Sequence, residues 1–195
     1  MSRLPGLTAA ERDPVQQALF ESITGGARAQ SDRDFGLVDA NGALRGPFNA
    51  MLYSPEIGDA VQKLGALLRF SSTLPADLRE VAILAVGAHW RADFEWYAHA
   101  LIAKKEGLDD ATIDAIKHGR TPEGDEDIAV VHRFASELLR ERRVGAETYG
   151  AALERLGERS VVELVFLVGY YTFISGTLNA FEVPVPEGAE APFAG

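Results

Sequence analysis

The sequence predicts an all-α protein, a bundle of antiparallel helix pairs that forms a single domain over residues 1–195. Two observations lead to this prediction. Apolar residues recur every three or four positions in one segment after another, which is the period of helices that bury one face. These segments open at Ser, Asp or Pro and close at Gly, and strand-like alternation is hard to find between them. A hydrophobic content of 47% and a charged content of 25% are typical of one globular domain with a sizeable core.

The first half of the chain predicts three helices and one loop. Asp13 and Pro14 open a helix that runs to about Ile23, and Gly25 and Gly26 end it. Residues 27–47 are mixed and polar, with a turn predicted at Asn41-Gly42, and this region is interpreted as a loop over a site. Ser54 and Pro55 then start a helix, for which the predicted buried stripe is Ile57, Val61, Leu64 and Leu68. Pro75 starts the next helix, and its predicted buried positions are Leu78, Val81, Ala82, Ala85 and Val86.

The second half predicts a longer series of helices. The segment HWRAD, residues 89–93, turns the chain into a helix that ends at Gly107. A short helix over 109–117, an acidic linker over 121–127, and helices over 128–143 and 146–156 follow. Ser160 and Glu163 form the pattern of a capping box at the start of the last long helix, and Pro184 and Pro186 come after its end.

Charge and composition exclude several classes of function. The net charge is −10, so the chain lacks the excess of positive charge that binds a nucleic acid or an anionic membrane, and neither is expected as a partner. Cysteine is absent, which excludes thiol chemistry in these residues and fits a reducing compartment. The first residues carry no secretory signal, so the cytoplasm is predicted. The apolar run over 161–181 is long enough to cross a bilayer, but its polar residues favour a buried core helix.

The stretch ADFEWYAHALIAKKEG, residues 92–107, carries an acid and an imidazole on one face of an apolar helix. Glu95 and His99 are one helical turn apart, so they can reach each other or one ligand. A carboxylate beside an imidazole raises the imidazole pKa and orients the ring, which yields a proton donor or acceptor for catalysis. The alternative is an ordinary pair at the edge of the core. Glu80, on the preceding helix, comes level with His99 if the two helices are antiparallel.

These motifs resemble a known family. The pattern LREVAILAVGA, then EWYAH and a helix ending in EGL, is similar to the carboxymuconolactone decarboxylase family, which includes the alkyl hydroperoxidase D proteins. The resemblance extends over about residues 47–184. It implies the all-α fold of that family and assembly as a homotrimer or homohexamer, in which the apolar helix over 160–182 would lie at a subunit interface.

The resemblance also implies roles for particular residues. The family's glutamate falls on Glu80 and its proton-relay histidine on His99, whereas the Cys-x-x-Cys pair of the hydroperoxidase branch falls on Ala92 and Glu95. Thiol peroxidase activity is therefore not expected. The thiol-free decarboxylase branch implies a lyase that needs no cofactor and no metal and acts on a small carboxylated or lactone-like compound.

The residues leave the reaction type open. An imidazolium held by a carboxylate can deliver a proton to carbon during decarboxylation, and the same groups serve isomerisation or lactone hydrolysis. A non-catalytic helical oligomer is a further alternative. Trp96, His89 and Tyr170 are candidates for contact with the substrate, although core packing is the favoured explanation for a tyrosine on the last helix. A metal site of Glu80, Glu95, His99 and His89 is chemically allowed, but no second Glu-x-x-His motif accompanies it, and no metal is predicted.

Overall fold

A computed structural model describes residues 2–26 and 36–193. Residues 27–35, part of the predicted loop over 27–47, lie outside the described residues. The helices are α1 (Pro14–Gly25), α3 (Pro47–Leu52), α4 (Pro55–Phe70), α5 (Ala76–Trp90), α6 (Asp93–Lys105), α7 (Asp110–Lys117), α8 (Glu126–Glu141) and α9 (Ala146–Ala180). Outside them the described residues show one isolated antiparallel bridge, Val38 to Leu44, and no strand. The predicted all-α fold is confirmed.

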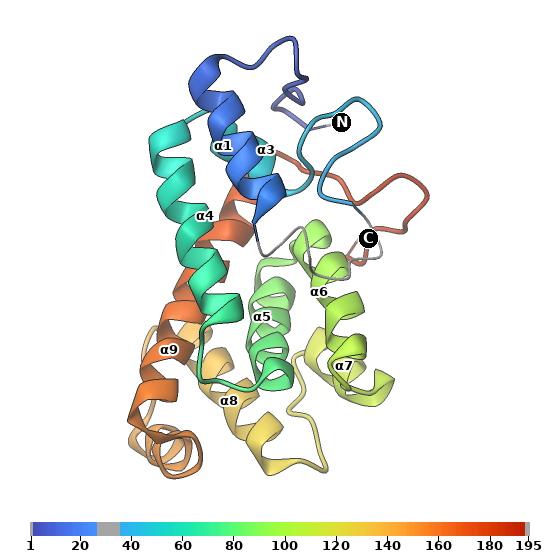
Figure 1. Ribbon diagram of the computed structural model, residues 1–195. Coiled ribbons are helices and arrows are strands. Elements are labelled where there is room, and N and C mark those ends of the chain that lie inside the picture. The colour runs from blue at the N-terminus through green and yellow to red at the C-terminus, as the bar shows by residue number, and fades with distance from the viewer. Residues whose placement is uncertain (1, 27–35, 194–195) are drawn as a thin grey trace.

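Helix α5 is the centre of the bundle. It packs against α6, α7, α8 and α9, and every residue from Leu78 to Gly87 is buried except Arg79 (Figure 1). A helix that is apolar on all sides is stable only inside a protein, which explains this central position. The predicted buried positions of this helix are correct.

Helices α5 and α6 form an antiparallel pair joined by a very short turn. Helix α5 continues through Trp90, so the turn consists only of Arg91, in a left-handed conformation (φ 47°), and Ala92. Asp93 then begins α6, which ends just before Gly107 (φ 99°). The turn predicted at HWRAD is thus present but shorter than expected, and it sets the register of the two helices that carry Glu80 and His99.

The stripe predicted for α4 is correct at Leu68, which is buried, and Val61 is partly buried against the core, but it is wrong at Ile57 and Leu64, which are exposed. Gly58, Gln62 and Gly65 are buried in their place. The reason is a close approach to α3: a Cβ on Gly58 would lie 2.3 Å from the carbonyl oxygen of Met51. Small residues therefore decide which face of α4 turns inward, and the larger apolar side chains remain outside.

Helix α9 contains both of the helices predicted near the C-terminus, separated by a break at Gly157 (φ 77°, ψ 163°). The predicted capping box is wrong. The Glu163 carboxylate accepts hydrogen bonds from the Ser72 hydroxyl and from the backbone N–H and hydroxyl of Thr73, ahead of α5. Ser160 is bonded to the Thr73 hydroxyl as well. Tertiary bonds between α9 and the start of α5 thus take the place of local capping.

By length and composition, α9 is the one helix among the described residues that could cross a membrane. Half of its most apolar window is buried inside the protein. Its inner side packs against α5 and α8, as expected for a core helix.

Candidate functional site

Glu80, His99 and Glu95 meet between α5 and α6. The Nδ1 atom of His99 lies 2.6 Å from Oε2 of Glu80, and its Nε2 atom lies 3.1 Å from Oε1 of Glu95. All three side chains are buried. Glu95 and His99 meet because they are four residues apart on one helix. Glu80 joins them from 19 positions earlier because α5 and α6 run antiparallel through a two-residue turn.

The two carboxylates stabilise the charged form of the imidazole. Burial lowers the pKa of His99. The charges and hydrogen bonds of Glu80 and Glu95 raise this pKa by more than burial lowers it, and the net effect is a rise from 6.5 to about 9. The ring is therefore an imidazolium at neutral pH, with both N–H groups donating to carboxylates. The carboxylates lie on opposite sides of the ring, so the three groups bind one another and do not converge on a metal position.

A small cavity of about 40 Å³ adjoins this cluster. His99 and Glu95 line it but Glu80 does not, so Glu80 holds the ring from behind while Glu95 and His99 face the space. The rest of the lining comes from α3, α4, α6 and α9 and is mainly apolar: Pro47, Phe48, Arg69, Phe94, Ala98, Ile102, Tyr170, Tyr171 and Ile174. The cavity holds a substituent the size of a carboxyl group, and not a whole substrate ring.

Tyr171 packs edge-on against the His99 ring, with the ring centroids 5.1 Å apart. Burial raises the pKa of Tyr171 well above 10, an effect that the Arg69 charge opposes and the charges of Glu95 and Glu80 reinforce. The hydroxyl therefore stays protonated, and it acts only as a hydrogen-bond donor or acceptor beside the imidazolium.

Arg69 is the site residue that the sequence reasoning missed. It is half-buried at the end of α4, and of the described residues that line the cavity it is the only lysine or arginine. Its guanidinium lies over the Phe70 ring, 5.3 Å from the centroid, and no carboxylate pairs with it among the described residues. A charged residue within the apolar segment Leu67–Phe70 was the available signal, but sequence alone did not indicate that α4 ends beside α6 and α9.

The structure places only one of the three predicted substrate contacts at this cavity. Tyr170 lines it. Trp96 follows Glu95 and so points about 100° away around α6, where its ring packs against Phe193 at a centroid distance of 5.5 Å. His89 is exposed at the end of α5 and lines a different cavity, of about 130 Å³, together with His132. Trp96 and His89 therefore do not line the cavity beside His99.

A larger cavity, of about 340 Å³, lies between the N-terminal segment, residues 39–50 and residues 181–187. Phe94 lines both this cavity and the one at His99. The Phe94 ring also packs against Gly46, where an added Cβ would lie 2.5 Å from the ring. Phe94 is therefore part of the wall of both cavities.

Taken together, the fold and the site define an all-α protein with a buried imidazolium between two carboxylates beside an apolar cavity. Residues 55–137 match the sequence model described as "Carboxymuconolactone decarboxylase family". This match covers less than half of the chain; together with the fold that the chain shares with alkyl hydroperoxidase D-like structures, it supports the resemblance to the carboxymuconolactone decarboxylase family seen in the sequence.

Several solved structures share the fold. An uncharacterised peroxidase-related protein from Ralstonia eutropha JMP134, with an alkylhydroperoxidase AhpD core, has a TM-score of 0.74 at 13% identity and covers 95% of this chain and 93% of its own. The debrominase Bmp8 has a TM-score of 0.70 at 14% identity, with 96% and 92% covered. A peroxidase-related protein from Silicibacter sp. TM1040 has a TM-score of 0.69 at 15% identity, with 92% and 91% covered. No curated protein sequence matched the chain. At these identities the likeness establishes the fold alone.

Proposed function

We propose that the protein is a cofactor-free carbon–carbon lyase that decarboxylates a small carboxylated or lactone-like compound by proton transfer through His99 and Glu95. The observation that carries this proposal is the buried arrangement in which Glu80 holds His99 on one side while Glu95 and His99 line an apolar cavity on the other. An apolar cavity favours loss of charge from a substrate carboxylate, and an imidazolium provides the proton that the product needs.

The proposed reaction consists of two steps. The bond between the substrate carbon and its carboxylate breaks, carbon dioxide leaves, and the electron pair moves into a conjugated carbonyl to form an enolate. The carbon then takes the proton held by His99 and Glu95, and the enolate returns to the carbonyl. The protein recovers its proton from water, so one proton is consumed for each carbon dioxide released.

Arg69 gives the site a positive charge where the substrate and the enolate are negative. The cluster of two carboxylates and one imidazolium has a net charge of −1, which would repel an anionic substrate. The guanidinium of Arg69 on the cavity wall offsets this repulsion and stabilises the oxygen that becomes negative in the first step. A carboxylate binds a guanidinium through two parallel hydrogen bonds, so Arg69 also orients the substrate.

The direct test is to incubate the protein with a carboxylated muconolactone and measure release of carbon dioxide. We expect release by the wild type and a loss of 10²-fold or more in kcat for His99→Gln, because general acid catalysis contributes about 10²- to 10⁴-fold. His118→Gln is the matched control, since His118 is exposed on α7's C-terminal end and lines no part of this cavity. If the wild type and His99→Gln both release no more than background, the decarboxylase proposal is removed.

An isomerase or lactone hydrolase is the second candidate. It is favoured by the presence of two proton-carrying groups, Glu95 and His99, on the same cavity wall, since isomerisation removes a proton at one carbon and returns it at another. Deuterium incorporation into an unsaturated lactone without carbon dioxide release would identify the isomerase, and ring opening would identify the hydrolase. Thiol peroxidase activity is disfavoured because Ala92 and Glu95 occupy the positions of the cysteine pair.

A further inference from the structure

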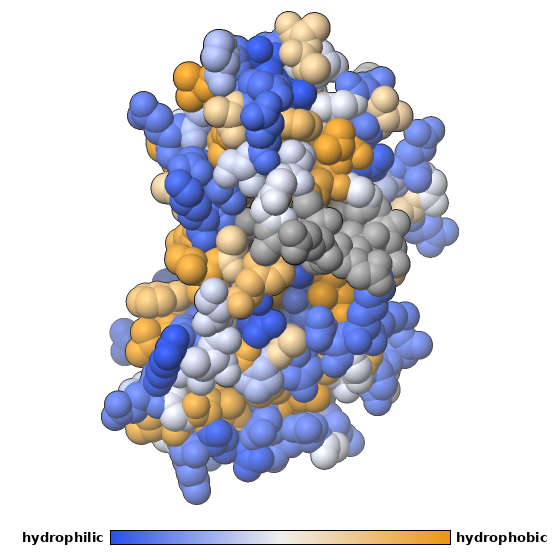
Figure 2. Space-filling model, in the orientation of Figure 1, coloured by the Kyte–Doolittle hydropathy of each residue, from blue (hydrophilic) through white to orange (hydrophobic). Residues whose placement is uncertain are grey.

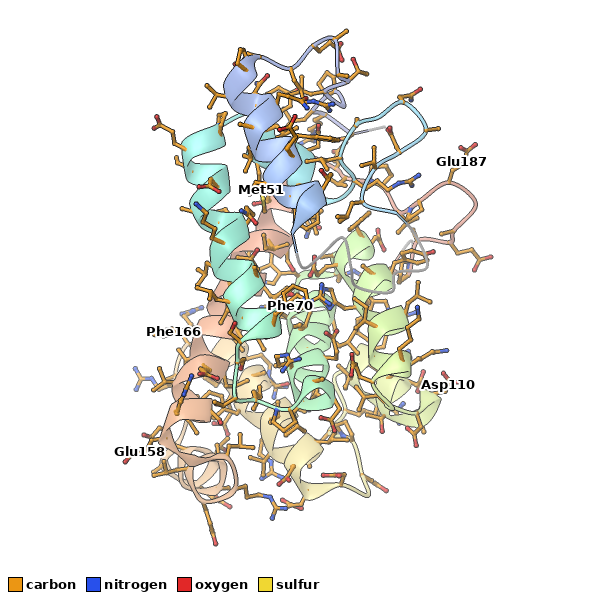
Figure 3. All side chains as sticks on the ribbon, in the orientation of Figure 1. Met51, Phe70, Asp110, Glu158, Phe166 and Glu187 are labelled. Atoms are coloured by element: carbon orange, nitrogen blue, oxygen red, sulfur yellow. The ribbon has the colours of Figure 1, made fainter. Side chains whose placement is uncertain are left out.

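The cavity that His89 and His132 line is enclosed by three helices, α5, α7 and α8. We name it the α5/α7/α8 cavity; its volume is about 130 Å³. Its lining comes from the last turns of α5 and α7 and from the middle and end of α8. Asp110 marks the opposite, N-terminal end of α7 (Figure 3). No residue lines both this cavity and the one at His99, so the space is separate from the proposed reaction site.

The side chains around the α5/α7/α8 cavity are basic. Lys117 and Arg140 line it together with the two histidines, and none of the described lining residues is Asp or Glu. The whole chain has 29 acidic and 19 basic residues, so this grouping runs against its overall charge. No described carboxylate pairs with either cation: Lys117 Nζ lies 5.7 Å from the Phe193 ring centroid, and Arg140 Nε donates to the backbone carbonyl of Ser136. Both positive charges are therefore available to a ligand.

Helix dipoles do not account for this grouping. Basic residues in the last turn of a helix often interact with its free carbonyl groups. In α7, however, carbonyls of the last turn accept hydrogen bonds from the N–H groups of His118, Gly119 and Arg120. An exposed cation on a hydrophilic surface, such as that over α6 and α7 in Figure 2, needs no ligand. Cations from two helices that line one cavity repel each other, and an anion between them removes this repulsion.

His132 is the buried polar residue of this cavity. Its side chain is 3% exposed, whereas His89 and Arg140 are exposed at the rim. The Nε2 atom of His132 lies 3.4 Å from Oγ of Ser136, and its Nδ1 atom is buried without a hydrogen-bond partner among the described residues. Buried polar groups are normally hydrogen-bonded, so this imidazole indicates a polar ligand. Ser136 also lines the cavity, and its hydroxyl can accept from the imidazole while it donates to that ligand.

The volume and the donors fit a tetrahedral oxyanion. A water molecule occupies about 30 Å³, so the cavity has room for about four, which is the size of a phosphate group with its four oxygens. We propose that the α5/α7/α8 cavity binds a phosphate group, as inorganic phosphate or as the terminal group of a phosphate monoester. Lys117 and Arg140 provide the opposing charge and Ser136 a hydroxyl donor. A chain with a net charge of −10 repels anions over most of its surface, so saturable binding identifies a specific site.

Calorimetric titration with inorganic phosphate, in a zwitterionic buffer at pH 7 and constant ionic strength, tests this inference. The wild type should bind one phosphate per chain. Lys117→Gln combined with Arg140→Gln should raise the dissociation constant at least ~100-fold, because two charge-assisted contacts are lost, and Ser136→Ala should raise it about 10-fold. Lys117 is half-buried and Arg140 is exposed, so the double variant should keep its helical circular dichroism.

The matched control is Lys63→Gln combined with Arg159→Gln. It removes the same charge from side chains that are 65% and 73% exposed on α4 and α9 and that line no part of this cavity. The control should keep the wild-type dissociation constant. A wild type without saturable binding would overturn the inference, and so would a control that loses as much affinity as the cavity variant.

Histidine ring resonances locate the bound anion. Saturating phosphate should shift the resonances of His132 and His89 and leave those of His99, which lies at the other cavity. Binding that leaves the His132 resonances unchanged would place the anion elsewhere and overturn the inference.

Two further ligands define its chemistry. Methyl phosphate that binds at least as tightly as inorganic phosphate would identify a monoester as the ligand, and weaker binding would identify the free anion. Acetate that binds as tightly as phosphate would overturn the assignment to a tetrahedral oxyanion.

Discussion

At the scale of single residues, His99 is unusual because each ring nitrogen faces a carboxylate while only one of the two carboxylates reaches the cavity. In the proposed reaction Glu80 is therefore a positioning residue, and Glu95 is the carboxylate that would exchange protons with a ligand. The sequence indicated the Glu95 and His99 pair through its spacing and Glu80 through the antiparallel turn. It did not indicate which carboxylate lies on the cavity side, because that depends on how α3, α4 and α9 pack around the pair.

The two glutamates should differ when each is replaced by glutamine. Glu80→Gln removes a negative charge behind the ring, so the pKa of His99 should fall from about 9 toward its usual 6.5, and the alkaline limb of the kcat profile should move to lower pH. Glu95→Gln should also lower the pKa of His99, because Glu95 raises it as well, and in addition it should lower kcat by 10²-fold or more at every pH, because the group facing the ligand is changed. Identical pH profiles for the wild type and Glu80→Gln would show that Glu80 does not set the charge of the ring.

Arg69 should affect substrate binding and the enolate separately. Arg69→Gln is expected to raise KM and lower kcat, together costing about 10²-fold or more in kcat/KM, because a charge-assisted pair and an oxyanion contact are both lost. Arg69→Lys should bring KM part of the way back to the wild-type value, since a point charge remains. It should recover little of the orientation of the substrate. Steady-state kinetics on the substrate found by the carbon dioxide assay measure both. An unchanged kcat/KM in Arg69→Gln would show that Arg69 does not contact the substrate or the enolate.

At the scale of helices, the starts and stops were predictable where local chemistry sets them. The Asp13 side chain accepts hydrogen bonds from the N–H groups of Val15 and Gln16, and Gly107 adopts a positive φ after α6. The prediction was wrong where distant contacts override the local signal. Glu163 bonds to the segment before α5 in place of a cap, and α4 turns Gly58 inward against Met51. A sequence pattern reports which side chains are apolar, but not which face a neighbouring backbone can approach.

Two glycines of α9 provide a matched pair at this scale. Gly157 has a φ of 77°, which a residue with a Cβ adopts only with strain, whereas Gly150 lies in the regular helix with open space around it. Gly157→Ala should lower the free energy of unfolding by about 1–2 kcal/mol, and Gly150→Ala should raise it by about 0.5–1 kcal/mol. Urea unfolding measures both. Equal effects of the two substitutions would mean that the break at Gly157 does not form in solution.

At the scale of the whole molecule, the fold was predictable because its largest signal, the apolar period of successive helices, extends over the length of the chain. Its consequence for the core is clear in α5, which is buried at Val81, Ala82 and Ala85 as predicted. The cavity was not predictable, because Phe48, Arg69 and Tyr171 come from three helices far apart in the sequence. Their meeting depends on packing angles that no local pattern encodes.

Two buried histidines should give the stability of the whole protein a maximum near pH 6.5. Burial, together with the nearby charges of Arg140 and Arg133, lowers the pKa of His132 to about 4. Between pH 6.5 and 4, His132 therefore binds a proton in the unfolded chain but not in the folded chain, and stability falls as the pH falls. His99 acts in the opposite direction. Its pKa of about 9 means that the folded chain keeps a proton which the unfolded chain loses above pH 6.5, so stability falls as the pH rises toward 9.

Urea unfolding from pH 4.5 to 9, at constant protein concentration, measures both limbs. Each should amount to at most about 3 kcal/mol, since one pKa unit corresponds to about 1.4 kcal/mol. His99→Gln should flatten the alkaline limb and leave the acid limb, and His132→Gln should do the reverse, while the exposed His118→Gln should keep both. Because the readout is the slope with pH, a loss of stability in a variant does not obscure it. A wild type whose stability is constant between pH 6.5 and 9 would show that Glu80 and Glu95 do not hold His99 as an imidazolium, and the proton proposed for the reaction would have no source in this cluster.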